Sequence, residues 1–85
     1  MGRDNYYTPS TEEKMAEVKM EICHILRREI LYSPRSQREI AWRLGTSQGN
    51  VSRVLNRRVE NLTINQLFRY LAILKPDFKI LVAPQ

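Results

Sequence analysis

The sequence predicts an all-α domain, in which a bundle of four to five helices is followed by a short C-terminal β-strand. Three segments begin with a capping box, a pattern in which Ser or Thr stands three positions before Glu or Gln and each side chain bonds the other's backbone amide. Apolar residues then recur at steps of three and four, as on the buried face of an amphipathic helix. With 85 residues, of which 42% are apolar, the chain has material for one compact domain.

The first helix is predicted to run from about Thr11 to Tyr32, with Ser10 and Glu13 as its capping box. Six apolar residues recur along it at helical spacing and are expected to form its buried stripe: Met15, Val18, Ile22, Ile25, Leu26 and Ile30. We therefore expect this helix to supply one long side of the core.

Cys23 is the sole cysteine, and it stands next to the sole histidine, His24, beside this stripe. No further metal ligand, base or orienting carboxylate is spaced to join them, so we expect both residues to serve in packing. One cysteine allows no intrachain disulfide, which indicates a reducing compartment. The first ten residues contain no apolar run of the signal-peptide kind, and we expect a cytoplasmic protein without membrane contact.

Two short helices are predicted next, separated by a tight turn. The earlier one starts after the Ser36 cap, carries Ile40, Ala41 and Leu44 inward, and stops at Gly45, which adopts the left-handed conformation at little cost. The later one starts after the Ser47 cap. Its inner face is expected to carry Val51, Val54 and Leu55. Its outer face is expected to carry Gln48, Gly49, Ser52, Arg53 and Asn56.

The last predicted helix opens at Thr63, with Gln66 completing its capping box, and ends before Pro76. Its inner face is expected to carry Leu67, Phe68, Leu71 and Leu74. The tail, residues 77–85, alternates in a β-favouring composition and predicts one strand. A lone strand is unstable, so it must pair with the N-terminal arm, residues 1–10, or with a second copy. We favour a two-fold dimer closed partly by this tail.

The net charge of the chain is concentrated in one segment. Six arginines and a single acid lie between Arg35 and Arg58, a local charge of +5, while the rest of the chain has eight basic and eight acidic residues. Such a concentrated basic patch is typical of proteins that bind a phosphate-rich partner. The alternative is a solvated charged face without a partner.

The segment from Gln37 to Leu55 has the residue types that a helix-turn-helix requires. Ala41 is small where the two helices cross closely, and Gly45 permits a sharp chain reversal. Val51 and Val54 pack the later helix against the earlier one and so fix the angle between them. In residues 11–76 we therefore predict a helix-turn-helix domain that binds double-stranded DNA, with its recognition helix beginning near Ser47.

This segment resembles the lambda-repressor-like (Xre/Cro) family of bacterial and phage regulators over roughly Arg35 to Leu74. The residues that carry the resemblance are Gln37, Ala41, Gly45, Gln48, Val51 and Ser52. The stretch that follows is similar to the HigA-like antitoxin branch. The resemblance implies that Gln37 binds a phosphate and supports Gln48, while the positions of Gln48, Gly49 and Arg53 face base edges. Because Gly49 has no side chain, one readout position of the family is vacant here.

The chemistry of these side chains agrees with what the resemblance implies. Gln48 suits a bidentate contact with adenine and Arg53 one with guanine, while Asn50 and Ser52 are further candidates for base contact. Phosphate contacts are expected from helix N-termini and from polar or basic side chains: Ser36, Gln37, Arg38, Arg43, Ser47, Asn56, Arg57 and Arg58.

The leading hypothesis is a sequence-specific transcriptional regulator, expected to be a repressor, that acts as a nucleoid-associated homodimer. An alternative is an antitoxin, which binds a toxin protein through the first helix or the tail and regulates its own operon. A third keeps the fold but uses the groove-facing side for a protein contact, with Arg57 and Arg58 merely solubilising a loop. No paired carboxylates, activated nucleophile, metal-ligand set or phosphate-binding loop is present, so we expect neither an enzyme nor a cofactor.

Overall fold

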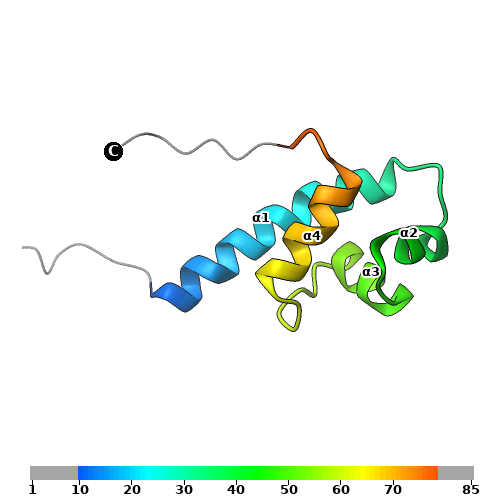
Figure 1. Cartoon of the computed structure of the whole chain (residues 1–85). Helices are drawn as coiled ribbons and strands as arrows, with labels where there is room; N and C mark the ends of the chain where they lie inside the picture. Colours follow the sequence, from blue (N-terminus) through cyan, green and yellow to red (C-terminus); the bar gives the residue numbers. More distant parts are fainter. Residues whose placement is uncertain (1–9, 79–85) are drawn as a thin grey trace, which may run out of the picture.

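The computed structural model describes residues 10–78, and these residues form an all-α structure of four helices. They are α1 (Thr11–Leu31), α2 (Gln37–Leu44), α3 (Gln48–Leu55) and α4 (Ile64–Leu74). Figure 1 shows α1 as the longest element, with α4 lying along it and with α2 and α3 paired on one side. Apart from their innermost residues, the expected N-terminal arm and C-terminal strand lie outside the described part of the chain.

The helices begin where the sequence predicts because each start is stabilised locally. Three capping boxes are complete: the hydroxyls of Ser10, Ser36 and Thr63 accept from the third amide of their helices, at 3.1, 3.1 and 3.0 Å. In each box the Glu or Gln side chain accepts from the cap's own amide. Ser47 caps α3 in the simpler way, by accepting from the amide of Asn50 at 3.0 Å. All four predicted helix starts are therefore confirmed.

One core joins the four helices. Its fully buried members come from every helix and from the loop between α3 and α4: Ile22, Cys23, Leu26, Ile30, Ile40, Ala41, Leu44, Val51, Val54, Val59, Leu62, Leu67, Tyr70 and Leu71. Burial of a side chain of this kind stabilises the folded state by about 1.5–3 kcal/mol where it is complete and the side chain is large. Ile25, Leu55, Phe68 and Leu74, which were expected to face inward, are partly buried against this core.

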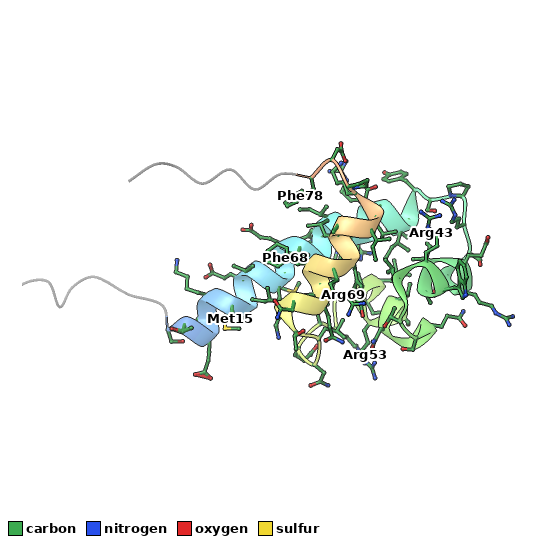
Figure 2. The ribbon with its side chains drawn as sticks, in the orientation of Figure 1. Met15, Arg43, Arg53, Phe68, Arg69 and Phe78 are labelled. Carbon is green, nitrogen blue, oxygen red and sulfur yellow. The ribbon has the colours of Figure 1, made fainter. Side chains whose placement is uncertain are left out.

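The prediction was wrong for the first part of the α1 stripe. Met15 is 44% exposed and Val18 is 41% exposed, although both continue the helical spacing of Ile22. The first turns of α1 project past the beginning of α4, as Figures 1 and 2 show, so the described residues offer little for these side chains to pack against. The helical spacing identified the correct face of α1, but it did not show how far along α1 the other helices pack.

Each of the two short helices ends in a left-handed residue. At the end of α2, Gly45 has φ 66°, its amide donates to the carbonyl of Trp42 at 3.1 Å, and the amide of Thr46 donates to that of Ala41 at 3.0 Å. This pair of bonds is the Schellman motif, in which glycine is favoured because it has no Cβ. Three residues, Gly45 to Ser47, separate the end of α2 from the start of α3, which agrees with the predicted tight turn.

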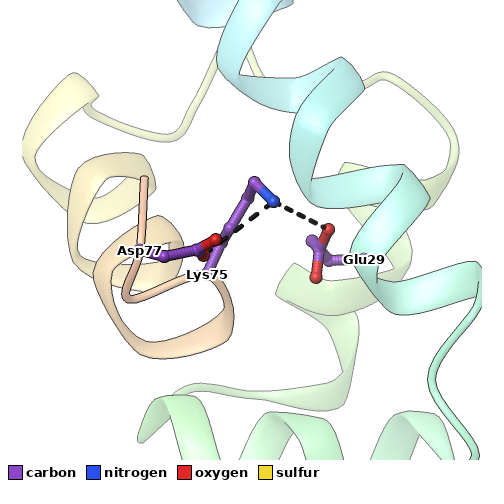
Figure 3. A network of polar contacts seen from close by, with 3 residues as sticks. All are labelled: Glu29, Lys75 and Asp77. Carbon is purple, nitrogen blue, oxygen red and sulfur yellow. Dashed lines mark ion pairs between the residues drawn. The ribbon is translucent and has the colours of Figure 1, made fainter. Parts of the chain in front are cut away.

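Ion pairs join the end of α4 to α1. The ammonium of Lys75 lies 3.9 Å from a carboxylate oxygen of Glu29 on α1 and 3.9 Å from one of Asp77, as Figure 3 shows. Because these side chains are partly exposed, we expect the pairs to contribute about 1 kcal/mol or less.

Candidate nucleic-acid interface

The side chains expected to contact bases lie at the start and along the outer face of α3. Gln48, Gly49 and Arg53 are exposed, whereas Asn50 and Ser52 are partly buried. Figure 2 shows Arg53 on the opposite side of the molecule from Phe78, beyond α3. The helix therefore presents one amide and one guanidinium to solvent, five positions apart in the sequence.

A series of hydrogen bonds ties the start of α3 to α4. The Tyr70 hydroxyl donates to Oγ1 of Thr46 at 2.9 Å, and Nδ2 of Asn50 donates to the same oxygen at 2.8 Å. Oδ1 of Asn50 in turn accepts from Nη1 of Arg53 at 2.7 Å. Sequence reasoning missed Thr46 and Tyr70. The step of three from Leu67 to Tyr70 was the available signal, since it places Tyr70 on the inner face of α4.

The end of α3 is held by α1. The Cys23 thiol donates to the carbonyl of Val54 at 3.2 Å, and Nε of Arg27 donates to the carbonyl of Leu55 at 2.7 Å. Burial raises the pKa of the Cys23 thiol above its ordinary value of 9.0, against the opposing effect of the Arg27 and Arg57 charges. The thiol therefore keeps its proton and remains a donor. As predicted, Cys23 is a packing residue, and it also satisfies a helix-end carbonyl. The prediction was wrong for His24, which is exposed because it faces away from the core side of α1.

The chain leaves α3 through a second Schellman motif, and here the left-handed residue is an arginine. The Arg57 amide donates to the carbonyl of Val54 at 3.1 Å and the Arg58 amide donates to that of Arg53 at 2.7 Å. Arg57 has φ 60°, close to the φ 66° of Gly45 in the equivalent position after α2. A non-glycine residue in this conformation is strained by about 1–2 kcal/mol. Local backbone geometry alone would thus favour glycine at residue 57.

The residues expected to contact phosphate come from α2, from the capping residues of α2 and α3, and from the turn after α3. Ser36, Gln37, Arg38, Arg43, Ser47, Asn56, Arg57 and Arg58 are all exposed. The Ser36 and Ser47 hydroxyls already cap their helices, and the Asn56 amide donates to the carbonyl and hydroxyl of Ser52 at 2.9 and 3.2 Å. No hydrogen bond joins Gln37 to Gln48 within residues 10–78.

The arginines of the basic segment keep their charge unneutralised by the part of the chain that the structure describes. None of the six between Arg35 and Arg58 forms an ion pair there. The carboxylate of Glu39, the sole acid of the segment, accepts from the Ser36 amide in the capping box. A positive potential is therefore expected over this face.

Trp42 is an exposed aromatic residue within this basic surface that sequence reasoning missed. It is 84% exposed on α2 and lines a shallow hollow with Arg35, Arg38, Glu39 and Arg43. An exposed tryptophan beside arginines offers an apolar face to a ribose or a base. It is also the sole tryptophan, so its fluorescence reports on this surface alone.

Comparisons of this chain with protein-family models, curated proteins and solved structures found no match. Within residues 10–78, no group of three or more His, Cys, Asp or Glu side chains is placed to hold a metal ion. No helix among the same residues is long and apolar enough to cross a membrane. The functional proposal therefore depends on the surface of α3 and its surroundings.

Proposed function

We propose that the chain is a helix-turn-helix regulator that binds double-stranded DNA as a homodimer, with α3 as the recognition helix in the major groove. One observation carries the proposal: α3 exposes Gln48 and Arg53, and the six arginines between Arg35 and Arg58 form no ion pair in the described structure. A surface that combines base-reading side chains with unneutralised charge suits a nucleic acid better than a protein partner.

The proposed interface makes two kinds of contact with DNA, one with bases and one with phosphates. Gln48 and Arg53 read adenine and guanine through bidentate hydrogen bonds, each of which discriminates by about 1–3 kcal/mol. Arg38, Arg43, Arg57 and Arg58 bind phosphates, which sets affinity and orientation but carries no sequence information. Gly49, lying between the two readers, lets the helix approach the groove closely.

A dimer follows from the small size of the reading surface. One eight-residue helix contacts too few base pairs for tight specific binding. Two copies related by a two-fold axis would place two such helices about 34 Å apart, on successive turns of the major groove. The operator would then be an inverted repeat, and a repressor would act by occupying it.

Selection of bound duplexes from a randomised library tests this proposal. The purified protein is expected to enrich an inverted repeat with half-sites about ten base pairs apart. Arg53→Ala is expected to lose the base preference at one base pair of each half-site, while Arg57→Ala is expected to lower the affinity for all sequences alike. Trp42 fluorescence gives the affinities without a label. Salt-sensitive binding without any enriched sequence would refute the proposed function.

The exposed Met15 and Val18 favour a second candidate, an antitoxin that binds a toxin protein through α1. Two apolar side chains on a projecting helix suit a partner that covers them. The test is co-purification of the chain with the product of a neighbouring short reading frame, with Val18→Lys as the disrupting variant. A neighbouring product that does not bind the wild-type chain would remove this candidate.

A further inference from the structure

Arg53 has an internal partner that fixes the direction of its guanidinium. An exposed arginine ordinarily samples many rotamers, and the entropy of this freedom amounts to about 2 kcal/mol. Here Nη1 of Arg53 donates to Oδ1 of Asn50, one helical turn earlier, at 2.7 Å. The other donors of the guanidinium stay available, because this group has five N–H bonds.

The chemistry of Arg53 also determines how the Asn50 amide is turned. A guanidinium has donors only, so the oxygen of the amide must face Arg53 and the nitrogen must face Thr46. Oγ1 of Thr46 must then accept, as it does from Asn50 at 2.8 Å. The second donor to the same oxygen is the hydroxyl of Tyr70, at 2.9 Å, whose residue is otherwise buried in the core. The directions of both bonds of the Asn50 side chain therefore follow from the chemistry of Arg53.

We propose that Asn50, Thr46 and Tyr70 are positioning residues that set the base preference of Arg53, an inference that rests on the proposed function. These three residues link the Arg53 guanidinium by hydrogen bonds to α4, which packs in the core. Asn50, expected from the sequence as a base contact, thus acts through Arg53, because its amide oxygen is occupied by the guanidinium and its nitrogen is bonded to Thr46. A guanidinium that is already oriented loses less side-chain entropy when it binds guanine than a freely rotating one does.

Matched variants at Thr46 and Tyr70 test this inference. Thr46→Val keeps the shape of the side chain but removes the hydroxyl, whereas Thr46→Ser keeps the hydroxyl and serves as the control. Tyr70→Phe removes the other donor and leaves the ring in the core. Asn50→Asp keeps an acceptor for Arg53 but removes the N–H that Thr46 receives. Each variant is assayed by duplex selection and, in the absence of DNA, by nitrogen-15 relaxation of the Arg53 Nε group.

Thr46→Val and Tyr70→Phe are expected to reduce the preference for guanine at the Arg53 base pair by about 2- to 12-fold, the equivalent of one hydrogen bond. The preference at the Gln48 base pair is expected to stay, and Thr46→Ser is expected to match the wild type. In DNA-free protein, Thr46→Val is expected to make the Arg53 guanidinium as mobile as that of Arg38, which has no such partner in the described structure.

Equal loss at both base pairs, or no change in both assays, would overturn the inference. The two proposals fail separately. If the wild-type chain selects no sequence, the proposed function falls, and the relaxation data still decide whether Arg53 is held. If the wild-type chain selects a sequence and Thr46→Val selects it equally well, only the positioning role falls.

Discussion

Replacement of Arg57 by glycine is expected to stabilise the fold and weaken DNA binding at the same time. Arg57 occupies the left-handed position after α3 with φ 60°, where Gly45 stands after α2. Glycine would relieve about 1–2 kcal/mol of backbone strain. Its greater freedom in the unfolded chain offsets part of this, by roughly 0.5–1 kcal/mol. The difference lies between about 0 and 1.5 kcal/mol, and its midpoint, a gain of roughly 0.7 kcal/mol in the free energy of unfolding, raises Tm by about 3–6 °C in a domain of this size.

The same substitution removes one of the charges that we propose to bind phosphate. The slope of log affinity against log salt concentration is expected to become shallower by about 0.9, whatever the DNA sequence. Circular dichroism melting measures the first effect, and Trp42 fluorescence titrations with duplex DNA at several salt concentrations measure the second. Arg58→Gly is the matched control, because it removes an equal charge from a residue whose φ is not positive. It is expected to weaken binding similarly without raising Tm.

A lower Tm for Arg57→Gly would refute the strain argument, since the substitution leaves both backbone bonds of the Schellman motif in place. An unchanged salt slope would instead refute the phosphate role of Arg57. The two outcomes are independent, so the experiment separates what the fold requires at this position from what the proposed function requires.

Three further predictions concern the glycines and the buried thiol. Gly49→Ala is expected to raise the free energy of unfolding by about 0.4–1 kcal/mol in melting experiments, because its Cβ would meet only the Ser47 hydroxyl, at 3.6 Å. It should nevertheless weaken specific DNA binding, and unchanged binding would show that no close approach occurs there. Gly45→Ala is expected to destabilise the fold by about 1–2 kcal/mol through strain at φ 66° alone, because its Cβ has nothing within 4 Å; an unchanged Tm would contradict this. Because burial raises the pKa of Cys23, its contribution to stability is intact well below pH 9.0, at which half of the unfolded thiol is ionised, and is lost as the pH rises through the folded pKa. Urea unfolding from pH 7 upward should show a smaller alkaline loss for Cys23→Ala than for the wild type, and equal losses would refute this assignment.

The local signals in the sequence predicted the helices well because each signal acts within one turn of chain. Ser10, Ser36, Ser47 and Thr63 cap the helices they were expected to cap, and Gly45 ends α2 in the left-handed conformation. Such interactions depend on neighbours within four residues, which the sequence states directly. The exposure of most of the expected base and phosphate contacts follows from the same local periodicity, although Asn50 and Ser52 are partly buried.

The features that the sequence did not predict depend on where helices end in space. Periodicity placed Met15 and Val18 on the correct face of α1, but only the packed structure shows that α4 begins too late to cover them. The bond from Tyr70 to Thr46 joins residues 24 positions apart, and nothing in either neighbourhood indicates it. The left-handed conformation of Arg57 was equally hidden, because arginine is not a residue that signals a helix end of this kind.

The orientation of α3 depends on two helices outside the α2–α3 pair. Hydrogen bonds from Cys23 and Arg27 of α1 hold its C-terminal carbonyls, and the bonds through Thr46 tie its first turn to Tyr70 of α4. Because α1 and α4 also pack against each other, a change in the angle of α3 would have to break bonds at one end or shift the core. Base-specific hydrogen bonds require donors that are placed to within about an ångström. Holding α3 at both ends would therefore favour the proposed base contacts. We therefore expect substitutions at Arg27, which is distant in sequence from every proposed base contact, to alter base preference as well as stability.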